Sequence, residues 1–345
     1  MKLTEEQKSV IKNILKFNKN VQILSGYAGT GKSCVVQHLA QVLDNFAVCA
    51  YTGKATDVLR KKGIDAKTIH SLIYKAHQDE ITKKISFFLE SNIDCDGVIV
   101  DEASMVSKEI YDDLVSFGKP IIFVGDHGQL EPISDKFNLM ANPDFTLETI
   151  HRNAGEIAHF AEFIRNGYKP RAWEHRNGCS KKVKFLPKNN YKEVLTEVDQ
   201  TICAFNKTRA EINVITRDLL GRSKDFPQIS DKIMCLRNNK KNGLFNGMQG
   251  YIGWFETKNI IQFVTSVRSF EVKMDLAHFN KIKYELDLDR DAPDPFDYAY
   301  AITCHKSQGD QFDKILVIEQ KCDLWDHVRW AYTAATRAEN MIYWS

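Results

Sequence analysis

The sequence has no feature of a membrane-spanning or secreted protein. No apolar run approaches the roughly 18 residues that a membrane helix needs. The N-terminus, Met1-Lys2-Leu3-Thr4-Glu5-Glu6-Gln7, lacks the apolar core of a signal peptide. We therefore expect a soluble, cytoplasmic protein that makes no contact with a membrane.

Cysteine pairs of the kind that bind zinc are also missing. The eight cysteines include no Cys-x-x-Cys pair, and none clusters with histidines at the spacing of zinc ligands. Several stand in apolar runs, as Cys49 does within Phe46–Ala50. We interpret the cysteines as reduced thiols and expect neither a structural zinc nor a disulfide framework.

Neither sign of charge dominates the chain. Its 47 Lys and Arg residues nearly balance its 45 Asp and Glu residues, which gives a formal net charge of +2. This balance excludes a globally basic surface for nucleic acid but leaves room for a local basic groove. The 345 residues are 43% hydrophobic and 27% charged, as in a globular protein, and at about 150 residues per domain they predict two or three domains.

The first half of the chain alternates short apolar runs with amphipathic stretches. This pattern predicts a parallel sheet flanked by helices, an α/β fold. Functional groups of such sheets lie beyond the carboxyl ends of the strands, so we expect a site there. The expected strands are Val21–Leu24, Ala47–Tyr51, Gly97–Val100 and Pro120–Val124.

The second half repeats this pattern around a segment of different texture. Between Phe226 and Asn280 short β-type runs alternate with Asn, Gly and Lys turns, which predicts a small antiparallel barrel inserted in a second α/β domain. The α/β elements expected on either side are strands at Thr201–Phe205, Ile315–Ile318 and Met341–Trp344 and helices at Thr208–Leu220 and Trp325–Arg337. The expected domains are residues 1–145, residues 146–225 together with 281–345, and the insertion 226–280.

The motif that points most directly to a function follows the first expected strand. The run Gly26-Tyr27-Ala28-Gly29-Thr30-Gly31-Lys32-Ser33 fits the P-loop pattern between a strand and a helix. Its glycines let backbone amides curl around phosphates, Lys32 would reach the β- and γ-phosphates, and Ser33 would bind Mg²⁺. The candidate nucleotide-binding residues are Gly26, Ala28, Gly29, Thr30, Gly31, Lys32 and Ser33.

Two further strand ends carry polar residues suited to phosphate hydrolysis. One apolar strand ends in Asp101-Glu102. Asp101 would hold Mg²⁺, directly or through water, and Glu102 would orient or deprotonate the attacking water. Another ends in Gly125-Asp126-His127-Gly128-Gln129-Leu130. The Gln129 amide can hydrogen-bond a γ-phosphate or its water and so distinguish ATP from ADP, whereas Asp126 could simply cap the following turn.

Gln7 has two interpretations that the sequence does not separate. In Thr4-Glu5-Glu6-Gln7, Thr4 is placed to cap a helix and Gln7 stands at the capping-box position. A glutamine amide can also donate and accept hydrogen bonds at the same time, so Gln7 could instead bind the edge of an adenine. Both interpretations remain open at this point.

With these segments in order, the chain resembles the superfamily one helicases of the RecD/Dda-like branch. The P-loop, the Asp101-Glu102 pair and the Gln129 segment look like motifs I, II and III, and the resemblance extends almost from end to end. Five further segments are similar to motifs Ia, Ib, IV, V and VI, of which the last two are long and specific. In that order they are Ala50–Ala55, Thr68–Leu72, Leu147–Arg152, Tyr300–Gly309 and Tyr332–Ala338.

The resemblance implies two RecA-like P-loop domains with parallel sheets, a small SH3-like β insertion in the second, and ATP with Mg²⁺ bound between the domains. It implies arginine fingers at Arg152 and Arg337, a role that suits a guanidinium because the transition state spreads negative charge over phosphoryl oxygens. Gln308 and Gly309 would also face the nucleotide. The implied catalytic residues are Lys32, Asp101, Glu102, Gln129, Arg152 and Arg337.

The resemblance further implies a track for nucleic acid across both domains. Small hydroxyls and lysines suit phosphate contacts, and histidine rings can stack on bases, although an isolated histidine is more often structural. The candidate nucleic-acid residues are Thr52, Lys54, Thr68, His70, Thr303, His305, Lys306, Ser307 and Gln308.

Members of the branch separate strands with a β-hairpin pin between motifs Ib and II. The corresponding segment here, residues 74–95, is short, with a turn expected near His77–Thr82. We interpret Phe87 and Phe88 in this segment as packing residues rather than wedges between bases. The sequence therefore leaves open whether residues 74–95 form a short pin insert within the first domain.

We expect an ATP-dependent DNA helicase or translocase that moves 5′ to 3′ along single-stranded DNA and separates duplex; the direction comes from the resemblance alone. It would act as a monomer on single strands and forked duplexes in a bacterial or phage-infected cytoplasm, alongside single-strand-binding or replication and recombination proteins. The alternatives are an ATPase that remodels nucleic acid without separating strands, and a P-loop phosphotransferase with a small acceptor. RNA could also serve as the track, because phosphate and stacking contacts read the sugar weakly.

Overall fold

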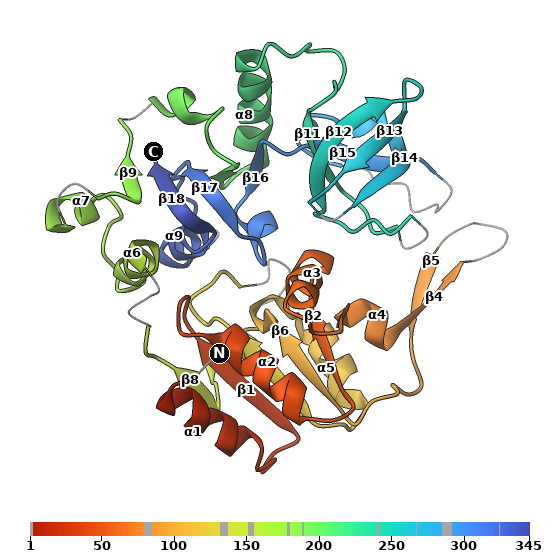
Figure 1. The fold of residues 1–345 in the computed structure, drawn as a ribbon, viewed down its shortest axis with the longest axis vertical. Coiled ribbons are helices and arrows are strands. Elements are labelled where there is room, and N and C mark those ends of the chain that lie inside the picture. Colours follow the sequence, from red (N-terminus) through yellow and green to blue (C-terminus); the bar gives the residue numbers. More distant parts are fainter. Residues whose placement is uncertain are drawn as a thin grey trace. The chain divides into compact units, whose positions relative to one another are not determined.

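The computed structural model describes residues 3–78, 85–131, 137–150, 155–177, 180–187, 190–239, 242–266, 268–284, 292–323 and 325–345 (Figure 1). The chain divides into two compact units. Unit 1 comprises Met1–His77, Ser86–Asn166 and the helical turn Val328–Tyr332, and most of the remainder, Gly167–His327 with Thr333–Ser345, makes up unit 2. In the described part of the chain no helix is long and apolar enough to cross a membrane.

Unit 1 is built on a six-stranded sheet with the strand order β3-β2-β6-β7-β1-β8. All of its strand pairs are parallel, which confirms the expected parallel α/β fold. Each strand expected from the sequence is present, with slightly different ends. The strands are β1 (Val21–Gly26), β2 (Phe46–Ala50), β3 (Ala66–Thr68), β6 (Gly97–Asp101), β7 (Ile121–Gly125) and β8 (Phe145–Leu147).

Hydrophobic clusters cover both faces of this sheet, and this burial explains why its strands are continuous apolar runs. Along β7, Ile122 and Val124 belong to a cluster with residues of α1, α2 and α3, whereas Ile121 and Phe123 belong to a second cluster with residues of α4 and α5. The helices of unit 1 are α1 (Glu5–Ile14), α2 (Lys32–Val42), α3 (Gly53–Lys61), α4 (Ile69–Ile73), α5 (Lys108–Ser116) and α6 (Gly155–Arg165), with 3-10 turns η1 (Ala103–Met105) and η2 (Leu139–Ala141). Because α6 lies in unit 1, this unit runs past residue 145, where the sequence suggested a boundary.

A two-stranded sheet of β4 (Tyr74–Gln78) and β5 (Ile85–Leu89) occupies the segment where a pin was considered. The turn between them lies outside the described residues, as does the side chain of Phe87. Phe88 is 58% exposed, and its interpretation as a packing residue rather than a wedge stays a prediction. The strands of a hairpin are therefore present in this short segment.

Unit 2 contains a five-stranded parallel sheet with the order β16-β10-β17-β18-β9. The strand expected at Thr201–Phe205 ends at Cys203, because Phe205 already serves as the N-cap residue of α8. The strands are β9 (Val183–Phe185), β10 (Gln200–Cys203), β16 (Ala301–Thr303), β17 (Phe312–Val317) and β18 (Ala338–Trp344), and the helical elements are α7 (Ala172–Asn177), α8 (Asn206–Leu219), α9 (His327–Ala335), η4 (Asn190–Val194) and η6 (His305–Ser307).

A closed five-stranded barrel forms the inserted part of unit 2. Its fifth strand lies beyond residue 280, so the insertion expected at 226–280 leaves this strand out, and its pairing with β14 is parallel rather than antiparallel. The sequence did not predict this fifth strand, because it contains Pro295 and two acidic residues, which are uncommon in strands. The strands are β11 (Lys232–Cys235), β12 (Gln249–Phe255), β13 (Ile260–Val264), β14 (Ser269–Asp275) and β15 (Asp294–Tyr298), and η5 (Leu276–His278) follows β14.

The two carboxylates of β15 are buried and have polar partners, as a buried charge requires. Asp294 accepts hydrogen bonds of 2.8 Å from Asn239 and 2.9 Å from Asn242. Asp297 forms a buried ion pair with Arg209 of α8. These contacts allow β15, which carries two carboxylates, to form one strand of the closed barrel, and they join β15 to α8.

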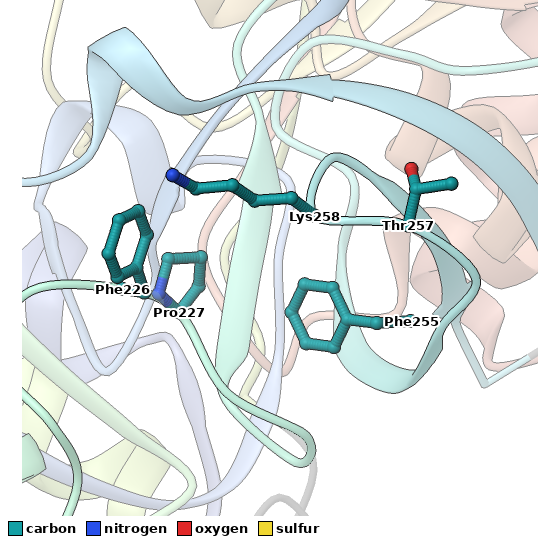
Figure 2. A pocket seen from close by; sticks show the side chains of 5 residues that line it. All are labelled: Phe226, Pro227, Phe255, Thr257 and Lys258. Carbon is teal, nitrogen blue, oxygen red and sulfur yellow. The ribbon is translucent and has the colours of Figure 1, made fainter.

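The barrel also carries a surface pocket of about 300 Å³ (Figure 2). Its walls are mostly apolar and aromatic, and the Lys258 side chain extends toward Phe226, with its Nζ 4.3 Å from the ring centroid (Figure 2). None of the candidate site residues contributes to it. The lining residues are Phe226, Pro227, Phe255, Thr257 and Lys258.

Candidate nucleotide and nucleic-acid sites

The P-loop connects β1 to α2 in unit 1. Gly29 and Gly31 both have φ of +83°, a conformation that side chains other than glycine disfavour. A Cβ at Gly26 would lie 2.7 Å from Oγ1 of Thr30, so this position also requires glycine. Gly31 is the N-cap of α2 and offers no side-chain cap, which leaves the first amides of that helix available to an anion.

Lys32 lies with its ammonium group inside this loop. Its Nζ donates hydrogen bonds to the carbonyl oxygens of Gly26 (2.6 Å) and Tyr27 (3.0 Å). It also lies 3.7 Å from Oδ2 of Asp126, whose side chain is fully buried. The ammonium group is thus held by P-loop carbonyls that a phosphate oxygen could replace.

Asp101 ends β6, and Glu102 follows it in a strained backbone conformation. Glu102 has φ of +53°, which is rare for a residue other than glycine and is commonest at functional sites. Its amide donates a hydrogen bond of 2.9 Å to Oδ1 of Asp101. Burial, and then repulsion from Glu102, raise the pKa of the Asp101 carboxyl to about 6. Negative charge at this strand end is therefore incompletely compensated by the protein.

This uncompensated charge fits a hard divalent cation. A hydroxyl at Ser33 and a carboxylate at Asp101 are the oxygen donors that Mg²⁺ prefers, and it usually takes few protein ligands alongside phosphate oxygens. In the described residues there is no group of three or more His, Cys, Asp or Glu side chains that could hold a metal ion. A cation bound here would therefore depend on the nucleotide for part of its coordination.

Asp126, which the sequence left between a turn cap and a functional residue, accepts hydrogen bonds from two groups. The amide of Gly128 donates to its Oδ1 at 2.9 Å, so the turn-cap interpretation is confirmed. The hydroxyl of Tyr332 donates to its Oδ2 at 2.7 Å, and the same hydroxyl accepts a hydrogen bond of 2.8 Å from the Ala28 amide. Asp126 thus joins the P-loop to the turn of α9 that belongs to unit 1.

Gln129 lies buried beside this network. Its side-chain oxygen, Oε1, is buried and has no hydrogen-bond partner among the described residues. An unpartnered buried acceptor is uncommon in proteins and indicates a missing donor. A water molecule poised for attack would supply that donor, as the sequence analysis proposed for this residue.

Gln7 makes the contacts of a capping box. Its Oε1 accepts a hydrogen bond from the Thr4 amide (3.0 Å), and Oγ1 of Thr4 accepts one from the Gln7 amide (3.3 Å). The structural interpretation is therefore confirmed. The Gln7 Nε2 also donates to the carbonyl of Thr30 at 3.1 Å, so the capping residue touches the P-loop. Binding of an adenine edge by Gln7 stays a prediction.

Arg165 is a residue that the sequence analysis missed. Its guanidinium carbon lies 3.3 Å from the ring centroid of Tyr27 in the P-loop. Its Nη1 is buried and has no partner among the residues that the structure describes. A basic residue in the last turn of a helix is ordinary, so no local signal could have marked it.

The two proposed arginine fingers differ in what the structure describes. Arg152 lies outside the described residues. Arg337 in unit 2 is 4% exposed, and its guanidinium donates to the carbonyl oxygens of Thr333 (3.1 Å), Asp310 (3.2 Å) and Ser307 (3.5 Å). In this arrangement Arg337 ties motif V to motif VI. Its role as a finger stays a prediction.

The first group of nucleic-acid candidates lies in unit 1. Thr52 and Thr68 are the N-cap residues of α3 and α4, and their hydroxyls accept hydrogen bonds from backbone amides. His70 lies between two tyrosines, 5.9 Å from the ring centroid of Tyr51 and 5.6 Å from that of Tyr74. The side chain of Lys54 is not among the side chains that the structure describes. Both threonines therefore act as helix caps, and the His70 ring packs against aromatic rings.

The second group follows β16 in unit 2. Ser307 is fully buried, and its hydroxyl donates to the carbonyl of Cys304 at 2.7 Å, so it faces inward. Burial lowers the pKa of both His305 and Lys306, and the Lys306 ammonium donates to Asn246. Thr303 ends the strand, and Gln308 and Gly309 follow η6, with Gly309 at φ of +78°.

These features define a P-loop nucleotide-binding protein with a second α/β unit. A model of the AAA domain family matches residues 2–183, and a model of the UvrD-like helicase C-terminal domain matches residues 298–343. Because the first match covers more than half of the chain, the chain belongs to the AAA-domain family. Within it, the chain is a member of the RecD/Pif1-like branch of superfamily one.

Related sequences agree with this placement. The chain is 26% identical to the protein MJ1519 of Methanocaldococcus jannaschii and 24% identical to the conjugal transfer protein TraA of Rhizobium radiobacter, over 99% of its own length in each case. It spans only 38% and 32% of the lengths of these two relatives. The ATP-dependent DNA helicase Pif1 of Campylobacter jejuni is 24% identical over 92% of the chain and 86% of that protein.

Solved structures share the fold. The chain is similar to Bacteroides Pif1 bound to single-stranded DNA, with a TM-score of 0.66 and 21% identity over 100% of this chain and 92% of that one. The Pif1 helicase of Candida albicans matches with a TM-score of 0.61 and 18% identity, over 100% of this chain and 94% of that one. At these identities the likeness establishes the fold, namely RecA-like α/β units with a small barrel insertion.

Proposed function

We propose that this chain is an ATP-dependent DNA helicase that moves 5′ to 3′ along single-stranded DNA and separates duplex. One observation carries the proposal: a P-loop, a pair of strand-end carboxylates and a buried glutamine with an unpartnered acceptor lie in the same unit. The names of the relatives, which include a DNA helicase and a RecBCD subunit, support DNA as the substrate. The direction rests on the family branch.

In the proposed reaction, the amides of the P-loop and Lys32 hold the phosphates of ATP, and Lys32 exchanges its carbonyl partners for phosphate oxygens. Mg²⁺ held by Ser33 and Asp101 would neutralise phosphate charge when bound. Glu102 orients the attacking water and takes its proton, and Oε1 of Gln129 accepts a hydrogen bond from that water.

Arg152 and Arg337 are proposed to neutralise the charge that develops on the γ-phosphate. Gln308 and Gly309 are proposed to face the nucleotide. The strand would contact Thr52, Lys54, Thr68 and His70 in unit 1 and Thr303, His305, Lys306 and Ser307 in unit 2. Because Ser307 is buried here, its contact requires a local rearrangement or a backbone group. We propose a monomer that acts with single-strand-binding or recombination proteins.

The proposal is tested by measuring the ATPase rate with and without oligo(dT), and strand displacement on 5′-tailed and 3′-tailed duplexes. Stimulation by the oligonucleotide and displacement only from the 5′ tail are expected, and both should vanish in Lys32→Ala. The exposed Lys12→Ala in α1 is the matched control and should behave like the native protein. A rate that ignores the strand would favour a phosphotransferase, and stimulation without displacement would favour a remodelling ATPase.

Two further measurements complete the test. Affinity for oligo(dT) should fall steeply with salt concentration, because phosphate contacts release counterions. An RNA oligonucleotide of the same length shows which sugar the track prefers. Light scattering during size exclusion measures whether the protein is a monomer.

A further inference from the structure

Three aromatic side chains gather at one edge of the unit 2 sheet. The strands β16, β10 and β17 are neighbours and run parallel, so their carboxyl ends meet at the same edge. His305 follows β16, Phe205 follows β10, and Trp325 lies in the segment after β17. The carboxyl edge of a parallel sheet is where ligands of such folds bind.

The three rings contact one another. The centroids of Phe205 and Trp325 lie 5.6 Å apart with the rings tilted by 42°, and those of His305 and Trp325 lie 5.6 Å apart with an edge-to-face angle of 73°. Phe205 is 36% exposed and Trp325 is partly exposed. We call Phe205, His305 and Trp325 the aromatic platform.

Phe205 occupies a position that normally takes a different residue. It is the N-cap of α8, and it supplies no side-chain hydrogen bond. In contrast, helices α1, α3, α4 and α5 each begin with a Thr or Ser whose hydroxyl caps a backbone amide. An exposed aromatic ring in place of a cap breaks a local rule, and such exceptions occur where function requires them.

The loop that carries Phe205 is held firmly in place. The amide of Ala204 donates to Oε1 of Gln320 at 3.1 Å, and Nε2 of Gln320 donates to Oγ1 of Thr208 at 2.8 Å. Gln320 therefore joins the segment after β17 to both the Phe205 loop and α8. A ring on a fixed backbone is suited to stacking because little conformational freedom is lost on contact.

The charges around the platform favour a base over a phosphate. Asp323 and Asp326 flank Trp325 in the chain and are exposed, so their carboxylates would repel a phosphate. Burial lowers the pKa of His305, which keeps this ring neutral at neutral pH. The π-faces of aromatic rings accept any nucleobase without reading its sequence.

We propose that Phe205 and Trp325 stack on a base of single-stranded nucleic acid, next to His305 of motif V. This inference rests on the proposed function and assigns it two residues outside the helicase motifs. Phe205 and Trp325 are in this view binding residues for the strand, whereas Gln320 is a positioning residue.

The test compares binding of oligo(dT) with binding of an abasic oligonucleotide of the same length and charge. Replacing the platform indole in Trp325→Leu should weaken oligo(dT) binding by about tenfold, the usual scale of one stacking contact, and leave abasic binding unchanged. Trp325→Phe keeps an aromatic face and should retain most of the affinity. Trp254→Leu, which removes a 37% exposed tryptophan on the barrel, is the matched control and should bind both strands normally.

A second variant keeps the test decisive even if Trp325→Leu folds poorly. Phe205→Asn removes a ring but adds a favourable N-cap side chain, so the variant should remain folded in thermal melting while binding oligo(dT) more weakly. Equal loss of oligo(dT) and abasic binding in these variants, or no loss at all, would overturn the stacking inference. If the native protein itself binds neither strand, the proposed function fails instead, so the two failures are distinguishable.

Discussion

The hydroxyl of Tyr332 donates a hydrogen bond of 2.7 Å to Asp126 and accepts one of 2.8 Å from the P-loop amide of Ala28. A residue of motif VI is thereby bonded to both motif I and motif III. The Tyr332 side chain is buried, and burial raises the pKa of its hydroxyl well above the usual value, so it remains a neutral donor. A nucleotide phosphate that takes the Ala28 amide would have to displace this hydroxyl.

Tyr332→Phe removes this hydroxyl, so that Oδ2 of Asp126 and the Ala28 amide each lose a hydrogen bond. We expect the free energy of unfolding to fall by about 1–3 kcal/mol, the usual scale of a lost hydrogen bond to a charged group. Urea denaturation measures it. Tyr111→Phe is the control, since Tyr111 packs on Phe123 and no hydrogen bond of its hydroxyl is seen in the described residues. An unchanged midpoint in Tyr332→Phe would show that the hydroxyl contributes little.

Asp101→Asn is expected to change the stability of the protein in a pH-dependent way and to abolish ATP hydrolysis. Burial and Glu102 raise the pKa of Asp101 from its ordinary value of 3.8 to about 6. Between these two pH values the carboxyl is ionised in the unfolded chain but still protonated in the folded one, so the folded state loses stability as the pH rises from about 4 to about 6. The asparagine variant avoids this loss. The melting temperature of the variant, relative to that of the native protein, should therefore rise between about pH 4 and about pH 6 and stay constant above that. ATP hydrolysis should be lost at every pH, and a constant difference in melting temperature would contradict the assignment.

Arg337→Ala should keep nucleotide binding but lose turnover by roughly 10³-fold if Arg337 is a finger. Its carbonyl contacts mean that stability should fall as well, so the turnover must be measured where the variant is still folded. Partial rescue of turnover by added guanidinium is expected for a catalytic charge. A variant that is less stable yet turns over normally would assign Arg337 to structure alone.

Arg165→Ala should weaken ATP binding by roughly tenfold or more, the scale of a charge-assisted hydrogen bond. The buried Nη1 lacks a partner among the described residues, and a phosphate oxygen would satisfy it. Isothermal titration with ATP measures the change. Arg60→Ala in α3 is a suitable control, because Arg60 is exposed and outside the candidate site. ATP affinity equal to that of the native protein would leave Arg165 as a packing residue for Tyr27.

Gln7→Ala should lower both stability and nucleotide selectivity if its two interpretations hold together. Loss of the capping box is expected to cost about 1 kcal/mol of unfolding free energy. If Gln7 also binds the adenine edge, the preference for ATP over GTP should diminish. Competition binding with the two nucleotides decides this, and an unchanged preference would restrict Gln7 to capping.

Local sequence determined the nucleotide site to a large extent. A P-loop depends on glycines at neighbouring positions, and the pattern of apolar runs indicates the order strand, loop and helix. The places of Lys32, Asp101 and Gln129 at strand ends could therefore be predicted. Hydrogen bonds within a few residues, as in the capping box of Gln7, were equally accessible. The barrel was recognised by its texture, but its fifth strand was not, because Asp294 and Asp297 have partners that only the folded chain brings close.

The sequence by itself therefore predicted a nucleotide-binding site, since a P-loop is a property of a short stretch of backbone. The tertiary structure decided which distant residues support that site and which aromatic rings meet elsewhere. Tyr332 and Asp126 stand 206 residues apart, and Phe205, His305 and Trp325 follow three different strands. Such contacts depend on strand order and packing, which no local pattern encodes.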